Sequence, residues 1–197
     1  MKLDIAHFEE LHRDPDPWGY HTRWYEARKR ALLLASLTRA RYRRGLELGC
    51  SNGALTRALA ARCDEMVATD AAANAVAQAR GALADLAHVQ VLHQRQPAQW
   101  PQGRFDLVVL GEIGYYLGID ELRALVLRIR ASLLEDALVV AAHWRHPCPD
   151  RQLDTGVVHE ELRGLGLHEA FAYRDDDLLL QAWSADAASV AQREGLA

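Results

Sequence analysis

The sequence predicts an α/β protein whose core is a mostly parallel, Rossmann-like sheet. Short apolar runs alternate with longer helical segments along most of the chain, which favours strands joined by helices on both faces of one sheet. Residues 105–110 are apolar apart from one aspartate, as a strand buried on both faces requires. Near the C-terminus, two apolar runs flank the short polar turn 174–177, which predicts an antiparallel hairpin.

The length of 197 residues favours a single domain over 1–197, large enough for a sizeable core. Within this domain we expect an N-terminal helical or cap segment over residues 1–42 and a Rossmann-like core over residues 43–184. The tail over residues 185–197 is expected to be loose helix or disordered.

The composition argues against several classes of partner. A formal net charge of −4 does not favour binding to nucleic acid. No apolar run approaches the length of a membrane span, and the first five residues lack the long apolar region of a signal peptide. Cys50, Cys63 and Cys148 have no paired spacing, which indicates a reducing environment. We therefore expect a cytoplasmic protein without nucleic-acid or membrane partners, and the choice between monomer and homodimer stays open.

The N-terminal segment is polar at first and then aromatic. Residues 14–17 read Asp-Pro-Asp-Pro, and the two prolines keep this stretch from being helical. From residue 18 to about residue 37, apolar residues recur at helical spacing and predict a helix. Its aromatic residues fit either a cap over a ligand pocket or a helix packed on the sheet edge. The basic residues between 23 and 44 indicate a solvated helix face or, alternatively, a patch for an anionic substrate.

The other elements follow in alternation. We expect helices over residues 54–62, 71–87, 120–134 and 156–165, and strands over 66–69, 89–92, 105–110, 137–142, 167–173 and 178–183, after a first strand that ends at Leu48. In such sheets a ligand lies beyond the carboxyl ends of the strands. The chemistry should therefore lie in the loops after Leu48, Thr69, Leu92, Leu110 and Ala142.

The loop after Leu48 carries the strongest single signal. It is a Gly-x-Ser-x-Gly turn from Gly49 to Gly53, and a helix follows it. Glycine accepts backbone angles that a side chain forbids, and such turns bring backbone N–H groups against a ligand at a helix N-terminus. About twenty residues later Asp70 ends the second strand, the spacing at which a carboxylate meets a ribose diol. A helix N-cap is the alternative interpretation of Asp70.

Several separated motifs, in this order, resemble the class I S-adenosylmethionine-dependent methyltransferases. They are Glu-Leu-Gly-Cys-Ser-Asn-Gly at 47–53, Asp70, Phe-Asp-Leu-Val-Val at 105–109, and the terminal hairpin. Asp-Pro-Trp at 16–18, Trp-Tyr-Glu at 24–26 and Gly-Glu-Ile-Gly-Tyr-Tyr-Leu at 111–117 are similar to the branch typified by the nodulation N-methyltransferase NodS. The likeness spans roughly residues 14–184. It implies a seven-stranded sheet of order 3-2-1-4-5-7-6 with an antiparallel C-terminal hairpin and an N-terminal helical cap.

The resemblance also implies S-adenosylmethionine as cofactor, with S-adenosylhomocysteine as its product. Gly49, Ser51 and Gly53 would shape the turn beneath the methionine and ribose, and Glu47 would lie near the amino end. Asp70 would accept hydrogen bonds from both ribose hydroxyls. The full expected set of cofactor-binding residues is Trp18, Glu47, Gly49, Cys50, Ser51, Gly53, Asp70, Ala71 (against the adenine), Gln94, Arg95, Glu112 and Ile113.

Two positions depart from the family pattern. Ser51 stands where many relatives have glycine, and it is small enough for the turn to survive. Arg95 occupies the loop where an aspartate usually bonds the adenine amine, and a guanidinium cannot accept that bond. Adenine would then be held by backbone groups near Gln94 and Arg95, or by stacking of Arg95 on the ring.

Methyl transfer from a sulfonium is an in-line displacement that needs a placed, dry nucleophile and, where required, a base. His143 is the leading candidate for a general base, because imidazole titrates near neutrality, and His159 is the second. Both are alternatively structural, hydrogen-bonded histidines. Glu112 would hold an ammonium substrate or accept its proton, unless it bonds the opening turn or the N-terminal segment. Tyr115, the remaining candidate catalytic residue, would line the pocket.

A metal site is not expected. His143, His146 and Cys148 lie near one another in the sequence, but prolines flank Cys148 and no matching ligand pair occurs elsewhere.

We expect methyl transfer to a nitrogen or oxygen of a small-molecule acceptor. The loop after Leu110 lacks the Asn/Asp-Pro-Pro-Tyr/Phe motif of many nucleobase-methylating enzymes, which disfavours DNA adenine as acceptor. A nicotinamide-dependent dehydrogenase and a non-catalytic regulatory module that binds a cofactor stay open as alternatives. The turn lacks the extra glycine of Gly-x-Gly-x-x-Gly, and the closing hairpin also argues against a dehydrogenase.

Overall fold

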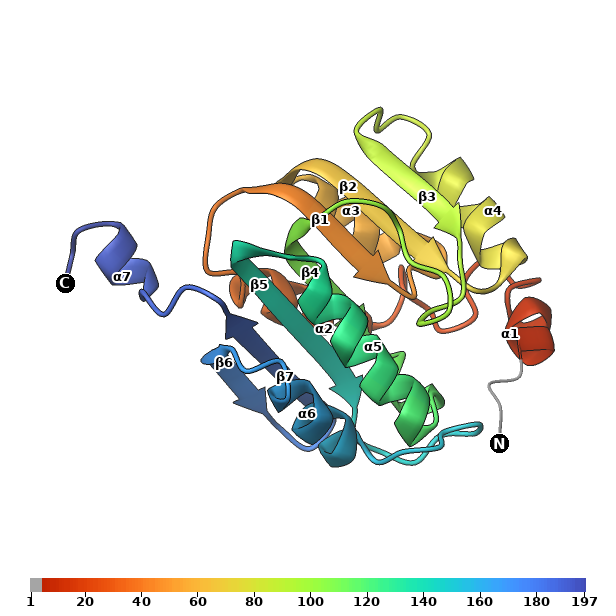
Figure 1. Ribbon diagram of the computed structural model, residues 1–197. Helices are drawn as coiled ribbons and strands as arrows, with labels where there is room; N and C mark the ends of the chain where they lie inside the picture. The colour runs from red at the N-terminus through yellow and green to blue at the C-terminus, as the bar shows by residue number, and fades with distance from the viewer. Residues whose placement is uncertain (1–4) are drawn as a thin grey trace.

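One seven-stranded sheet runs through the protein, in the order β3-β2-β1-β4-β5-β7-β6 (Figure 1). The computed structural model describes residues 5–197, so residues 1–4 of the stretch considered above for a signal peptide lie outside the described residues. Strands β1 to β5 run parallel, and β7 runs antiparallel to both of its neighbours. The predicted strand order and the antiparallel C-terminal hairpin are thus confirmed.

The strands are β1 (Tyr42–Leu48), β2 (Cys63–Asp70), β3 (Val89–His93), β4 (Phe105–Gly111), β5 (Leu133–Trp144), β6 (His168–Arg174) and β7 (Leu178–Ser184). The helices are α1 (Ile5–Leu11), α2 (Trp24–Ala35), α3 (Ala54–Ala60), α4 (Ala73–Ala82), the 3₁₀ turn η1 (Gly114–Tyr116), α5 (Ile119–Ala131), α6 (Thr155–Arg163) and α7 (Val190–Arg193).

Helices cover both faces of the sheet. On one face Val108 and Val139 pack with the apolar sides of α5 and α6. On the other face Leu107 and Val140 pack with α2 and α3, and α4 covers β2 and β3. Successive strand residues point to opposite faces of the sheet, and helices cover both faces. Odd- and even-numbered positions must therefore both be apolar, which is why β4 and β5 are near-continuous hydrophobic runs.

The aspartate within β4 lies at the end of the sheet away from the strands' carboxyl termini. Asp106 is buried, and its carboxylate accepts the backbone N–H groups of Arg43 at 2.9 Å and Arg44 at 2.8 Å. The Arg43 side chain also donates to Asp106 at 3.2 Å. A buried charge that is paired and hydrogen-bonded in this way is compatible with the core.

Two N-terminal predictions were wrong in detail. No separate helix was predicted before residue 14, but α1 forms over Ile5–Leu11 and lies against α4. The helix expected from residue 18 begins only at Trp24. The Asp16 carboxylate accepts the backbone N–H groups of Tyr20 at 2.6 Å and His21 at 3.2 Å, and Gly19 has a φ of +70°. This turn takes the backbone donors that a helix would need.

The tail departs from the sheet after β7. It forms the short helix α7, which lies at the far side of the molecule from α1 (Figure 1). Arg193 of α7 donates to Asp186 at 3.0 Å and to the carbonyl of Thr38 at 3.3 Å. In the described part of the chain, no helix combines the length and apolarity needed to cross a membrane.

Candidate active site

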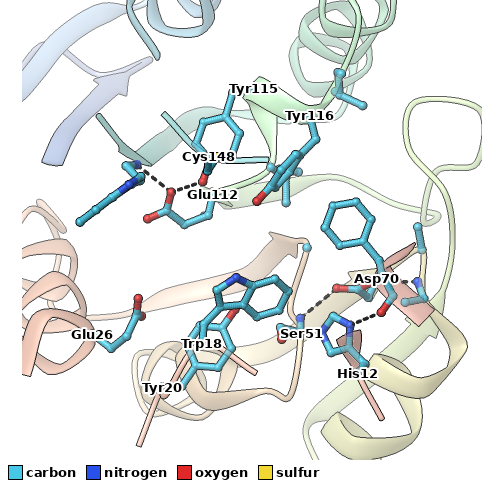
Figure 2. Close-up of a pocket in the computed structure, with 18 of the residues that line it drawn as sticks. His12, Trp18, Tyr20, Glu26, Ser51, Asp70, Glu112, Tyr115, Tyr116 and Cys148 are labelled. Atoms are coloured by element: carbon cyan, nitrogen blue, oxygen red, sulfur yellow. Dashed lines mark hydrogen bonds between the residues drawn. The ribbon is translucent and has the colours of Figure 1, made fainter. Parts of the chain in front are cut away.

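A cavity of about 390 Å³ lies between the carboxyl ends of the strands and the N-terminal segment. Residues at or just after the ends of β1, β2, β3, β4 and β5 line one side, so the cavity lies where the site was expected. Side chains from α1, α2 and the loop between them line the opposite side (Figure 2). The N-terminal segment therefore covers the cavity, in agreement with the cap interpretation.

The turn after β1 brings backbone against the cavity. Gly49 has a φ of +76°, and a Cβ at this position would lie 2.1 Å from Cγ2 of Ile113. The backbone N–H groups of Gly49 and Cys50 both donate to the carbonyl of Thr69, at 2.8 and 3.0 Å. Only glycine fits this close approach of two loops, so the first glycine of the motif is required by geometry.

Ser51 occupies the left-handed region at a φ of +48°, a conformation that costs a residue with a side chain about 1–2 kcal/mol. The expectation that the turn survives a serine here agrees with the structure. Nδ1 of His12 donates to the carbonyl of Phe8 at 2.7 Å, so Nε2 accepts from the Ser51 hydroxyl at 2.8 Å. Ser51 thus ties the turn to the N-terminal segment, a contact that glycine cannot make.

Asp70 lies at the end of β2 with its carboxylate facing the cavity beside Gly49 (Figure 2). Its two oxygens accept the backbone N–H groups of Ser51 and Ala72, each at 2.9 Å. The N-cap residue of α4 is Ala72, so Asp70 also supports the start of that helix. Burial raises the pKa of Asp70, and the bonds from Ala72 and Ser51 oppose this increase. Each oxygen keeps a lone pair for a further donor. The observed bonds are therefore compatible with binding of a ribose diol by Asp70, which stays a prediction.

Glu47 lies beneath the turn and lines a smaller cavity of about 40 Å³ rather than the main one. It is buried, and the Thr56 hydroxyl donates to it at 2.5 Å. Burial raises the pKa of Glu47 to about 8. Cys50 lines the same small cavity, whereas Gly53 packs against Leu83 and lines neither cavity.

Residues after β3 line the cavity beyond Asp70. Arg95 lines it and forms a distant ion pair with Glu121 at 3.8 Å. Gln94, expected to bind the cofactor, does not line it, whereas its neighbour Gln96 does. Within residues 5–197, the buried Nε2 of Gln96 has no hydrogen-bond partner. An amide offers both a donor and an acceptor to a purine edge, which an arginine cannot do.

Glu112 lies at the tip of β4, also in the left-handed region, with a φ of +62°. One carboxylate oxygen accepts from the Tyr115 hydroxyl at 2.6 Å and from the backbone N–H of Trp144 at 2.7 Å. The other accepts from Nζ of Lys29 at 2.9 Å. Glu112 therefore lines the cavity and bonds the N-terminal segment through Lys29, in agreement with the structural interpretation, while its role toward a substrate stays a prediction.

Lys29 belongs to α2 and was grouped with a solvated basic face, which is wrong for this residue. It is buried between Glu112 and Glu26, and Glu26 accepts from it at 3.0 Å. Burial by itself would lower the pKa of Lys29, but the two carboxylates together raise it. Lys29 is therefore a cation held inside the site.

The structure does not support His143 as general base. Its side chain is fully buried and does not line the cavity. Nε2 accepts from the backbone N–H of Gly114 at 3.1 Å, and Nδ1 lies 3.0 Å from Nε2 of His159. His159 in turn bonds Oε1 of Gln181 through Nδ1 at 2.8 Å. Both histidines fit the structural interpretation instead.

This chain of bonds fixes the tautomers. Because an amide oxygen only accepts, His159 carries its proton on Nδ1, and its Nε2 accepts from Nδ1–H of His143. Burial lowers the pKa of His143 well below its usual range and lowers that of His159 to about 4. Both rings are neutral near pH 7, and they hold the turn that carries Glu112 and Tyr115.

No cluster of three or more histidine, cysteine or acidic side chains suited to a metal ion occurs within residues 5–197. His146 pairs with Asp177 at 2.7 Å, while Cys148 turns toward the cavity. The three residues considered above for a metal site therefore point to different surroundings.

The structure brings most of the expected cofactor residues to one cavity. Those that line it are Trp18, Gly49, Ser51, Asp70, Ala71, Arg95, Glu112 and Ile113, and Tyr115 of the expected catalytic residues joins them. The aromatic rings of Tyr20 and Tyr25 line it too, as the cap interpretation expected. Lining residues that were not expected from the sequence are Phe8, His12, Glu26, Lys29, Gln96 and Trp144. One sequence feature could have indicated the two residues of α2. Glu26 and Lys29 are an acidic and a basic residue three positions apart, and such residues lie next to each other on a helix surface.

The strand order, the closing hairpin and the position of the cavity define the class I methyltransferase fold. Residues 7–148 match the model of the Nodulation protein S (NodS) family. The chain therefore belongs to the NodS family.

Individual relatives agree with this assignment. Nodulation protein S of Rhizobium tropici is 33% identical over 113 residues, which cover 56% of this chain and 48% of that protein. That of Sinorhizobium fredii is 29% identical, covering 57% and 54%. The chain thus spans about half the length of these curated relatives.

Two solved structures extend the similarity over most of the chain. A crystal structure from Pseudomonas syringae, named provisionally as a methyltransferase, is 45% identical with a TM-score of 0.75, covering 82% of this chain and 99% of that one. N-methyltransferase NodS from Bradyrhizobium japonicum WM9, solved with S-adenosyl-L-homocysteine, is 22% identical with a TM-score of 0.84, covering 91% and 97%. The second similarity concerns the fold alone.

Proposed function

We propose that this protein is an S-adenosylmethionine-dependent methyltransferase whose acceptor is an amine nitrogen of a small molecule. The observation that carries the proposal is a single cavity with two chemically different ends. Figure 2 shows Asp70 and Ser51 at one end and the carboxylates of Glu26 and Glu112 at the other, and Lys29 donates to both carboxylates. Membership of the NodS family supports it, as does the solved NodS protein, named an N-methyltransferase.

The residues at the first end fit an adenosyl group. Asp70 would accept from the ribose hydroxyls, the Gly49 turn would lie under the methionine, and Gln96 would satisfy its unpaired amide on the adenine edge. When bound, the cofactor supplies a methyl group made electrophilic by a sulfonium. The chain itself contributes the placement of the acceptor and the exclusion of water by the N-terminal segment.

The second end favours nitrogen over oxygen as the acceptor atom. Glu26 and Glu112 carry two negative charges around the single cation of Lys29, and the aromatic rings of Tyr25 and Trp144 lie beside them. An excess of carboxylate in a mostly aromatic pocket attracts an ammonium group. The displacement is expected to be direct and in-line, because the cofactor end and the acidic end face each other across one cavity.

Calorimetry with S-adenosylmethionine, S-adenosylhomocysteine and NAD tests the cofactor. Binding of NAD alone would favour the dehydrogenase alternative and overturn the proposal. A transfer assay with labelled S-adenosylmethionine and panels of small amines and phenols tests the acceptor. Methylation of phenols but not amines would replace nitrogen by oxygen, and tight S-adenosylhomocysteine binding without any transfer would favour a regulatory module.

A further inference from the structure

Two carboxylates of unequal surroundings border the acceptor end of the cavity. Glu26 projects from α2 and Glu112 from the tip of β4, and Figure 2 shows them on opposite walls. Lys29 lies between them, 3.0 Å from Oε1 of Glu26 and 2.9 Å from Oε1 of Glu112. The three side chains form one row of alternating charge across the cavity.

The two carboxylates differ in how many donors they hold. Glu112 accepts three hydrogen bonds, from the Tyr115 hydroxyl and the Trp144 backbone N–H at Oε2 and from Lys29 at Oε1, so Oε2 is filled and Oε1 keeps one lone pair. Glu26 accepts only from Lys29, through Oε1. Within the described residues, Oε2 of Glu26 has no hydrogen-bond partner. A carboxylate oxygen with a free lone pair can accept a proton, whereas one that already holds two donors is a fixed anchor.

The surroundings of Glu26 also make its carboxylate a stronger proton acceptor than an exposed glutamate. It is only 6% exposed, and burial raises its pKa above the usual carboxyl range, with Lys29 opposing the increase. Glu112 adds to the increase through like-charge repulsion. When two carboxylates in one site have different surroundings, they commonly take different roles. Here Glu112 holds three donors and fits the anchor, while Glu26 holds one donor and fits the proton acceptor.

Glu26 does not act in isolation. The titratable and charged groups that face it are Lys29 and Arg30 of its own helix, Glu112 after β4, and the phenols of Tyr20 and Tyr25. The hydroxyl of Tyr25 is buried, lines the cavity and has no partner within residues 5–197. Burial raises the pKa of Tyr25, so this phenol stays protonated and is a donor rather than a base.

We infer that Glu26 is the catalytic residue that removes the proton from the acceptor ammonium, while Glu112 holds Tyr115 and Lys29 in place. This inference rests on the proposed function. An N–H bond of the ammonium breaks, an O–H bond forms on Glu26, and the electron pair stays on nitrogen as the nucleophile. The charge of the ammonium and that of the carboxylate cancel, so Glu26 ends neutral. The nitrogen lone pair would then form the N–C bond to the methyl group as the S–C bond breaks, S-adenosylhomocysteine would leave as the neutral thioether, and Glu26 would lose its proton to solvent before the next turnover.

The test compares Glu26→Gln with the intact chain in two separate measurements. Calorimetry with S-adenosylhomocysteine reports the cofactor end, and turnover of methylated amines from labelled S-adenosylmethionine reports the acceptor end. Glutamine keeps the oxygen that accepts from Lys29 but cannot take a proton. Glu160→Gln is the matched control, because Glu160 lies on α6 with a 69% exposed side chain paired with Arg163.

We expect Glu26→Gln to bind S-adenosylhomocysteine within about twofold of the intact chain and to lose a factor of about 100 or more in kcat. The kcat of the intact chain should fall at low pH as Glu26 becomes protonated. In the variant, kcat should instead increase steadily with pH until the pH reaches the pKa of the free amine. Glu160→Gln should match the intact chain in both measurements.

Three results would overturn the inference. An unchanged kcat and pH profile would show that Glu26 takes no proton. A loss of tenfold or more in S-adenosylhomocysteine affinity would place Glu26 on the cofactor instead. If no amine is methylated while S-adenosylhomocysteine binds, the proposed amine acceptor fails, and the inference fails with it.

Discussion

Replacing Asp70 by alanine tests the cofactor end of the site most directly. Each carboxylate oxygen holds one backbone N–H at 2.9 Å and keeps a lone pair for the cavity. The carboxylate is therefore aimed and rigid before a ligand arrives, so little ordering is needed to bind a diol. Hydrogen bonds to a charged group contribute about 1.5–3 kcal/mol each, and losing the pair while water refills the gap should cost about 1–3 kcal/mol.

This loss corresponds to roughly a 5- to 150-fold weaker affinity for S-adenosylhomocysteine, measured by calorimetry. The matched control is Asp64→Asn at the opposite end of the same strand, where Asp64 is exposed and paired with Arg41. Asp64→Asn should leave the affinity unchanged. An Asp70→Ala variant that binds as tightly as the intact chain would refute the ribose role.

The pH dependence of this affinity carries a defined sign. The diol needs an ionised acceptor, and burial raises the pKa of Asp70 above the usual aspartate range. Affinity for S-adenosylhomocysteine should therefore fall as the pH is lowered through that raised pKa. In Asp70→Ala this decline should disappear, and a decline of equal size in the variant would assign it to another group.

Three further changes test the supporting structure. Gly49→Ala places a Cβ 2.1 Å from Ile113 at a φ of +76°. We expect the unfolding free energy, measured in urea, to fall by at least about 2 kcal/mol and S-adenosylhomocysteine binding to be lost. A variant that stays stable and binds would contradict the turn geometry. Ser51→Gly should change the unfolding free energy by less than about 1 kcal/mol, because relief of the left-handed strain offsets the lost hydrogen bond to His12. Amide hydrogen exchange over residues 8–20 should nevertheless become faster. Unaltered exchange there would show that the Ser51–His12 bond does not hold the N-terminal segment. The pKa of His159 is lowered from 6.5 to about 4, so its stabilising contribution is present above pH 6.5 and is lost as the pH falls toward 4, by at most about 3 kcal/mol. His159→Leu should flatten urea midpoints measured between pH 7.5 and pH 4.5, and an unchanged slope would show that other groups set it.

Much of the site could be predicted from local sequence because its parts follow strand ends. A glycine at position 49 and an aspartate at position 70 each reflect one backbone requirement, a left-handed turn and a strand terminus. Parallel strands bring their carboxyl ends to one edge, so residues distant in sequence converge without any knowledge of side-chain packing. This is why Gly49, Asp70 and Glu112 were placed in one cavity correctly.

The histidines show where local reasoning fails. His143 was expected just after a strand, as Glu112 is, but it lies within β5, where its ring points into the core and pairs with His159. Adjacent positions on a strand face opposite sides of a sheet, and which side borders the cavity depends on the helices that cover each face. A motif cannot supply that information, so the general-base assignment could not be made from the residue type.

The sequence by itself determined the alternation of strands and helices, the closing hairpin, the glycine turn and the acid at the end of β2, because each depends on periodicity or on a local backbone requirement. The sheet order was implied by the family resemblance. Only the tertiary structure decided that Glu26 and Lys29 are buried beside the cavity. Their burial arises where α2 lies across the tip of β4, an approach between segments more than 80 residues apart, with Lys29 and Glu112 separated by 83 positions. A charged residue in a sequence can be exposed to solvent or buried in a site. Which of the two occurs depends on how a distant element packs against it.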